Sequence, residues 1–127
     1  MRLLLDTHLL IWALAKSAKV SKPVRNLIED ANNELLFSVA SIWELSIKYS
    51  LKPKGLIVPS VFHRELLDLG YQELSVTGEH ALAVVSLPHL HKDPFDRILI
   101  AQATVERALL LTVDSAIAEY PGPIRKV

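Results

Sequence analysis

The sequence contains no cysteine, and this absence removes several kinds of chemistry at once. Without thiols the chain cannot form disulfides, thiolate zinc sites or a cysteine nucleophile. Because cysteine-free chains are common in the cytosol, we expect a cytoplasmic protein. No apolar run approaches the roughly 20 residues that a membrane span needs. Asp6 interrupts the first apolar stretch, so we expect neither a transmembrane helix nor a signal peptide.

Net charge is also absent, since 14 basic residues balance 14 acidic ones. Bulk electrostatics therefore indicates no partner, and any nucleic-acid contact must come from a local patch. The densest basic segment either follows an RNA backbone or forms a solvated face; it contains Lys16, Lys19, Lys22 and Arg25. With 50% hydrophobic and 22% charged residues the chain is not disordered. Its length predicts a single domain over residues 1–127.

The sequence does contain short apolar runs that alternate with amphipathic segments. Buried strands are predicted at residues 2–5, 35–37, 71–76, 108–113 and 124–127. Helices are predicted at residues 7–14 and 41–51, after the N-cap candidates Ser21 and Thr77, and from Pro59 and Pro94. Strands that alternate with helices predict a three-layer α/β/α domain around a central, mostly parallel sheet of four or five strands.

Four acidic residues occupy positions that such a sheet exposes at its carboxyl edge, where ligands bind in α/β folds. Asp6 follows the first strand and Glu44 lies in the helix after the second. Asp96 lies in the first turn of the helix that begins at Pro94, and Asp114 follows the next strand. Clustered carboxylates repel each other unless a cation compensates, and an all-oxygen set favours Mg²⁺ or Mn²⁺. Such an ion can activate water and stabilise charge on a phosphodiester.

A purely structural role is the alternative for each of these acids. The segment from Ser41 to Glu44 matches a capping box, Asp96 suits the positive end of a helix, and Asp114 can cap a short helix. Asp6 is the hardest to explain structurally, because an acid that ends a buried strand has little structural purpose there. We therefore expect Asp6→Asn to leave folding intact while it removes activity.

Five residues near the acids are candidate substrate contacts: Thr7, His91, Lys92, Arg97 and Thr112. For Arg97 an ion pair with Asp93 or Asp96 is favoured over contact with an RNA phosphate, and for the threonines a hydrogen bond to nearby backbone is the commoner role. Asp93 itself is predicted to be the N-cap of the helix that begins at Pro94. The histidines lack the spacing of a zinc site, so zinc is not expected.

The segments that hold these residues resemble a known family. They are Leu-Leu-Asp-Thr-His at 4–8, Ser-Val-Ala-Ser-Ile-Trp-Glu at 38–44, Asp-Pro-Phe-Asp-Arg at 93–97 and Thr-Val-Asp at 112–114. This pattern resembles the PIN-domain nucleases, and more narrowly the VapC-type ribonuclease toxins of bacterial toxin–antitoxin pairs. The resemblance implies an Mg²⁺- or Mn²⁺-dependent endoribonuclease and a cognate antitoxin that blocks the site. It maps the family's four acids onto Asp6, Glu44, Asp96 and Asp114.

Other functions remain as alternatives. A receiver-like phosphoacceptor module has similar strand-end acids, but it uses paired acids after the first strand, where Asp6 is single. A haloacid-dehalogenase-like phosphatase needs a second aspartate at the position of His8. A PIN-like domain without activity, serving only as a binding partner, is disfavoured by four intact acids.

The apolar helices predicted at residues 7–14 and 41–51 bear directly on assembly. Together with Trp12 and Trp43 they carry more hydrophobic surface than one face of a small sheet should need. We therefore expect a homodimer, or a buried antitoxin contact, that uses part of this surface.

Overall fold

The computed structural model describes residues 1–127 and is built around one sheet of five strands, all of them parallel. The strands are β1 (Arg2–Leu5), β2 (Glu34–Ser38), β3 (Gln72–Leu74), β4 (Leu109–Thr112) and β5 (Ile124–Lys126), in the spatial order β3-β2-β1-β4-β5. Parallel pairing requires a crossover between neighbouring strands, and the helices supply these connections. The predicted sheet of four or five mostly parallel strands is confirmed.

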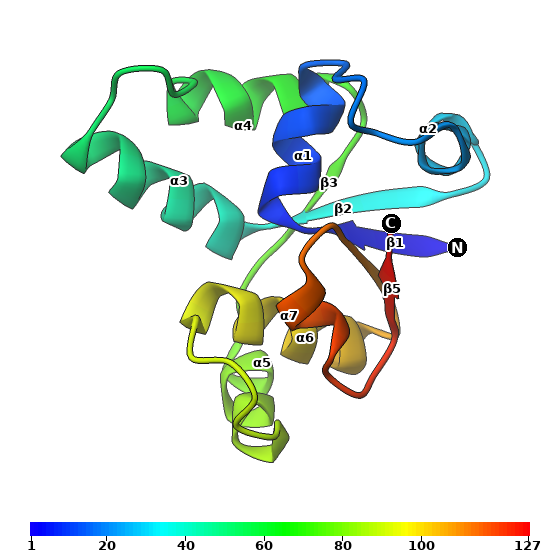
Figure 1. Ribbon diagram of the computed structural model, residues 1–127, viewed down its shortest axis with the longest axis vertical. Coiled ribbons are helices and arrows are strands. Elements are labelled where there is room, and N and C mark those ends of the chain that lie inside the picture. Colours follow the sequence, from blue (N-terminus) through cyan, green and yellow to red (C-terminus); the bar gives the residue numbers. More distant parts are fainter.

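Helices cover both faces of the sheet, which gives three layers (Figure 1). The helices are α1 (Thr7–Leu14), α2 (Lys22–Glu29), α3 (Val39–Leu51), α4 (Pro59–Asp68), α5 (Gly78–Ala83), α6 (Pro94–Glu106) and α7 (Ser115–Ala118), with a 3-10 turn at Val84–Ser86. In Figure 1, α1, α3 and α4 lie above the sheet and α5, α6 and α7 lie below it. None of the helices combines the length and apolar character that crossing a membrane requires.

The side chains of each strand alternate between the two faces of the sheet, and this divides the core into two halves. In β1, Leu3 and Leu5 pack against α1, α2 and α4, whereas Leu4 packs with Leu99 and Ile100 of α6 on the other face. Successive strand side chains point to opposite faces, so a wholly apolar strand is what a sheet covered on both sides needs. This is why the short run at residues 2–5 was recognisable as a strand.

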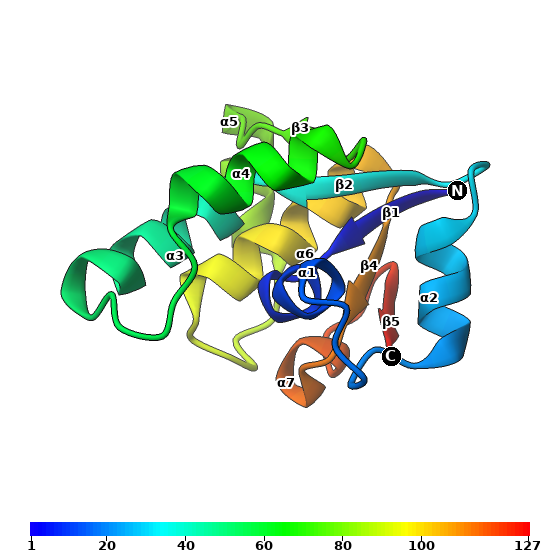
Figure 2. The same ribbon diagram turned by 90° about the horizontal axis from the view of Figure 1, so that it is seen from above.

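The strand order reverses direction at β1, which has β2 on one side and β4 on the other. In open α/β sheets this switch point opens a crevice outside the carboxyl ends of the strands. The chain leaves β1 at Asp6, β2 at Val39 and β4 at Val113, and all three exits lie at the same edge. From above, α2 lies beside the amino end of β1, away from this edge (Figure 2).

Helix boundaries agree with the predicted caps except at α3. That helix begins at Val39 rather than Ser41, because the Ser38 hydroxyl accepts the Ala40 N–H at 3.0 Å and makes Ser38 the N-cap. The predicted caps Asp93 and Thr77 are confirmed. The strand predicted at residues 71–76 is shorter than expected, because β3 contains only Gln72–Leu74 at the sheet edge.

Candidate functional site

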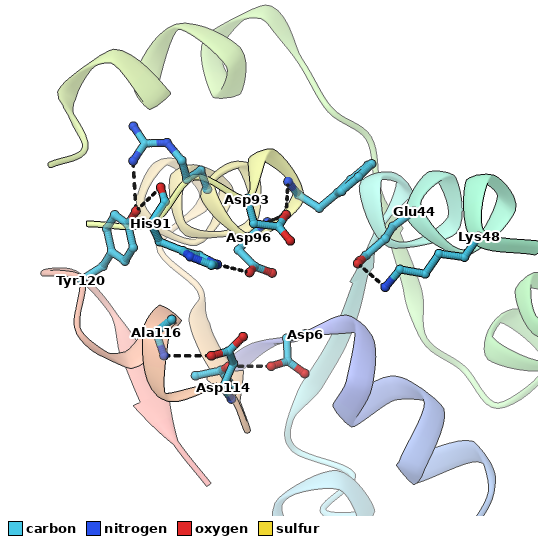
Figure 3. Close-up of polar contacts among 12 residues, drawn as sticks. Asp6, Glu44, Lys48, His91, Asp93, Asp96, Asp114, Ala116 and Tyr120 are labelled. Carbon is cyan, nitrogen blue, oxygen red and sulfur yellow. Dashed lines mark hydrogen bonds and ion pairs between the residues drawn. The ribbon is translucent and has the colours of Figure 1, made fainter. Parts of the chain in front are cut away.

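A small polar cavity of about 100 Å³ lies at the carboxyl edge of the sheet. Its lining consists of Asp6, Thr7, His8, Glu44, Lys48, Asp93, Asp96, Asp114 and Ile117. All four acids proposed from the sequence are in this lining, although up to 108 positions separate them along the chain. Figure 3 shows their carboxylates directed toward a common space between the ends of β1 and β4, the second turn of α3 and the first turn of α6.

Asp6 is almost completely buried and serves two parts of the fold. Its Oδ1 accepts the Leu9 N–H at 2.8 Å and so caps α1, while its Oδ2 accepts the Thr112 hydroxyl and the Val113 N–H from the end of β4. The expectation that Asp6 has little structural purpose is therefore wrong. Burial raises the pKa of Asp6 above its ordinary value, and these hydrogen bonds partly offset that rise.

Glu44 lies on the second turn of α3 and is paired with a lysine. Its Oε2 is 2.9 Å from the Lys48 Nζ, four residues further along the same helix face. The capping-box explanation for Glu44 is wrong, because the helix is capped by Ser38 and the hydroxyl of Ser41 instead accepts a hydrogen bond from Thr7. Glu44 thus has a buried carboxylate with no capping role.

Asp96 is the acid whose protonation is most strongly altered. Its pKa is raised to about 6, chiefly by burial and also by the nearby charges of Asp93 and Asp114, while a hydrogen bond from His91 offsets part of the rise. The His91 Nε2 lies 2.8 Å from the Asp96 Oδ2. Asp93 accepts the N–H groups of Phe95 and Asp96 through its Oδ1 as the N-cap of α6, which leaves its other oxygen free of hydrogen bonds.

Asp114 also caps a helix while its side chain lines the cavity. Its Oδ1 accepts the Ala116 N–H at 2.8 Å and caps α7, as the structural alternative predicted. Thr112, buried at the end of β4, connects it to Asp6. The Thr112 hydroxyl donates to the Asp6 Oδ2 and accepts the Asp114 N–H at 3.0 Å. Thr112 therefore orients two of the acids instead of facing open solvent.

The remaining candidate substrate contacts do not all line the cavity. Thr7 lines the cavity and donates its hydroxyl to the Ser41 Oγ at 2.8 Å. Lys92 is exposed and borders an apolar groove that includes Trp43. The structure does not bring Arg97 to the cavity.

The guanidinium of Arg97 is buried and binds the carbonyl oxygens of Pro88 and Val84 and the hydroxyl of Tyr120. The predicted ion pair of Arg97 with Asp93 or Asp96 is therefore wrong.

Four residues of the cavity were not proposed as site residues from the sequence: His8, Lys48, Asp93, which was predicted only as an N-cap, and Ile117. Lys48 was missed although its position four residues after Glu44 places it on the same helix face. His8 was considered only for zinc, yet it lies two residues after Asp6, in the first turn of α1. Lys48 and His8 could both have been found by asking which titratable residues share a helix face or a first turn with a proposed acid.

The donor chemistry of the cavity fits a hard divalent cation. Its lining contains five carboxylates, and the donors suited to Mg²⁺ or Mn²⁺ are oxygens of this kind. Burial, and then repulsion from Asp93 and Asp114, raise the pKa of Asp96, and a bound cation would offset this repulsion. A water molecule needs a volume of at least about 10–15 Å³. The cavity therefore has room for an ion and several waters.

Both the sequence and the fold are similar to known proteins. A family model described as PIN domain matches residues 3–123. VapBC2 from Rickettsia felis, solved with a DNA fragment from its promoter, has a TM-score of 0.73 and 17% identity, over 99% of this chain and 98% of that chain. DNA-bound VapBC from Salmonella typhimurium has a TM-score of 0.68 and 13% identity, over the same shares of the two chains.

VapBC-1 from nontypeable Haemophilus influenzae has a TM-score of 0.63 and 19% identity, over 99% of this chain and 98% of that chain. At these identities the likeness establishes a shared fold. The comparison with curated protein sequences gave no match.

Proposed function

The chain belongs to the PIN domain family, and from this premise we propose that it is a divalent-metal-dependent endoribonuclease. It would cleave phosphodiester bonds of single-stranded RNA and act as the toxin of a toxin–antitoxin pair. The observation that carries the proposal is the meeting of Asp6, Glu44, Asp96 and Asp114 in one cavity. A fold alone does not require four acids from distant segments to face one another, because the repulsion among them costs stability.

Asp6, Glu44, Asp96 and Asp114 would hold Mg²⁺ or Mn²⁺ through their carboxylate oxygens. When bound, the cation supplies a Lewis acid that activates water and neutralises phosphodiester charge. The chain's own part is to keep these oxygens in place: Thr112 orients Asp6 and Lys48 holds Glu44. Lys48, whose side chain is half exposed, would also attract the phosphates of an RNA strand that lies over the cavity.

Two kinds of protein partner belong to this proposal. The three solved structures described above are named VapBC, which supports a cognate antitoxin as the second protein. A second copy of the chain is supported by α3, where Trp43, Ile47 and Leu51 recur every four residues and all expose apolar surface. These side chains form one stripe, which we call the α3 stripe.

The receiver-like alternative is weakened by the family match, which covers nearly the whole chain. A PIN-like domain that only binds partners remains a distinct candidate, and an activity assay separates it from the nuclease. Such a domain would have no need for catalytic carboxylates, and removing one of them would change nothing beyond stability.

The test uses Glu44→Gln, because Glu44 is the acid with no capping role. The purified protein should cleave single-stranded RNA with Mg²⁺ or Mn²⁺ and lose this activity in EDTA. Glu44→Gln should lower cleavage by more than about 100-fold with little change in thermal stability. Glu29→Gln, an exposed acid on α2, is the matched control and should retain full activity.

The products give a second readout. Direct attack by water does not use the ribose 2′-hydroxyl, so the fragments should carry 5′-phosphate and 3′-hydroxyl ends. Cleavage that persists in EDTA, or a Glu44→Gln variant with normal activity, would refute the proposal. Fragments that end in cyclic phosphates would show that a different reaction is taking place.

A further inference from the structure

His91 approaches Asp96 from behind the acidic cavity. The histidine Nε2 contacts the Asp96 Oδ2 at 2.8 Å, and 29% of the His91 side chain is exposed against 17% of Asp96. Asp96 lines the cavity, but His91 does not. Figure 3 shows the imidazole on the side of Asp96 that faces away from Glu44, so the histidine meets only one edge of the carboxylate. The other Asp96 oxygen is left for the cavity.

The segment that carries His91 has no regular secondary structure, yet it is firmly tied to the core. Tyr120 donates its hydroxyl to the carbonyl oxygen of His91 at 3.0 Å and accepts a hydrogen bond from Arg97 at the same distance. Arg97 also donates to the carbonyl of Pro88 at 2.8 Å and to that of Val84 at 3.3 Å. By donating to both carbonyl oxygens, the buried guanidinium holds the backbone of residues 84–88 in place.

We propose that His91 is a positioning residue that orients Asp96 for cation binding, and that Tyr120 and Arg97 hold His91 in place for this purpose. A carboxylate on a short side chain can rotate about its terminal bond, so one strong donor at one oxygen selects one orientation. To donate to Asp96, His91 must carry a proton on Nε2. The inference rests on the proposed function, because it assigns a role at the same metal site.

Direct coordination by His91 is the competing explanation. The ligand atoms of His91, Asp93 and Asp96 all lie within 4.8 Å of one another, so a cation between them is geometrically conceivable. The cavity that collects the other carboxylates, however, is bounded by Asp96 and excludes His91. The geometry therefore favours a histidine that acts through Asp96. Partners of this outer kind typically alter metal affinity by 10–100-fold when they are removed.

The experiment measures Mn²⁺ affinity of the purified protein by electron paramagnetic resonance, without RNA. His91→Ala should weaken Mn²⁺ binding by about 10–100-fold. His91→Gln keeps a side-chain N–H that can reach the carboxylate and should recover most of the affinity. His89→Ala is the matched control, since His89 is an exposed histidine of the same loop with no hydrogen-bond partner, and it should bind Mn²⁺ as the wild type does.

Tyr120→Phe tests the support of the loop. It should weaken Mn²⁺ binding less than His91→Ala does, and it should have little further effect when combined with His91→Ala, because both act along one chain of contacts. A role in stability alone would instead lower the unfolding temperature and leave the Mn²⁺ affinity unchanged.

Three outcomes would overturn the inference. They are unchanged affinity in His91→Ala, no recovery in His91→Gln, and ¹⁴N couplings on bound Mn²⁺ that identify His91 as a ligand. If His91→Ala binds normally while Glu44→Gln does not bind, only the role of His91 is lost. If the wild type binds no Mn²⁺, the proposed function itself fails, and the two failures are thus distinguishable.

Discussion

Replacing Asp96 by asparagine should stabilise the metal-free protein, and the gain should grow as the pH rises. The amide keeps an oxygen that can accept the hydrogen bond from His91, but it removes the negative charge. That charge is costly in the folded state. Burial is the largest cause of the rise in the pKa of Asp96 from 3.8 to about 6, and the hydrogen bond from His91 offsets only part of it.

The direction of the pH effect follows from proton binding. Because the pKa of Asp96 is higher in the folded than in the unfolded state, the folded protein binds more protons between pH 3.8 and about 6. The stabilising contribution is complete below this window and is lost as the pH rises through about 6. The difference between a pKa of 3.8 and one of about 6 corresponds to about 3 kcal/mol in the free energy of unfolding.

The assay is urea unfolding in EDTA at pH 5 and pH 7.5. Asp96→Asn should be more stable than the wild type at both values, and its advantage should be larger by about 1–2 kcal/mol at pH 7.5. Asp68→Asn is the control, because Asp68 is exposed and makes no side-chain hydrogen bond or ion pair. Its effect should be within about 0.5 kcal/mol at both values.

Adding Mn²⁺ should reverse the order of the two proteins. A ligand at 100 times its dissociation constant stabilises a protein by about 2.7 kcal/mol, and Asp96→Asn should lose most of this gain. If the advantage of Asp96→Asn in EDTA is the same at both pH values, burial of its charge is not the cause. If the variant is less stable than the wild type at pH 7.5, the reasoning about Asp96 is wrong.

Two further predictions concern β4 and the α3 stripe. Thr112→Val should lower the free energy of unfolding by about 2–3 kcal/mol, because the Asp6 carboxylate loses a donor and the half-buried Asp114 N–H loses its acceptor. Thr112→Ser, which keeps the hydroxyl, should lose much less in the same urea titration. Trp43→Lys should shift a dimer toward monomer in analytical ultracentrifugation, since 62% of this tryptophan is exposed. Leu69 is an equally exposed apolar residue at the end of α4, so Leu69→Lys should leave the assembly unchanged. A wild type that is monomeric at all concentrations would contradict the role of the α3 stripe.

The features that sequence reasoning predicted correctly are local ones. β1 was recognisable because a wholly apolar run must be covered on both faces, and α6 because Asp93 and Pro94 form a cap and a first turn. The gathering of the acids was also predictable, since parallel strands end at one edge and Asp6 and Asp114 follow neighbouring strands. These inferences need only periodicity, capping chemistry and topology.

The features that were missed depend on contacts between distant segments. Asp6 accepts a hydrogen bond from Thr112, which is 106 positions away, and no pattern around Asp6 could reveal that second function. Arg97 was expected to pair with a neighbouring acid, but burial turns its guanidinium toward Tyr120 and the loop carbonyls. An unpaired arginine in a core satisfies its donors with carbonyl oxygens, and which carbonyls these are is decided only by the complete fold.

The acids of the cavity fall into two groups, and the difference decides which mutations are informative. Asp6, Asp93 and Asp114 each accept backbone N–H groups at the start of a helix, so the fold itself holds their oxygens in place. Glu44 and Asp96 are held by the side chains of Lys48 and His91 instead. Replacing a capping acid must therefore disturb a helix start as well as the cavity, and a loss of activity there is ambiguous. Replacing Glu44 or Asp96 removes charge from the cavity without removing a cap, so a loss of activity at these two positions reports on the chemistry alone.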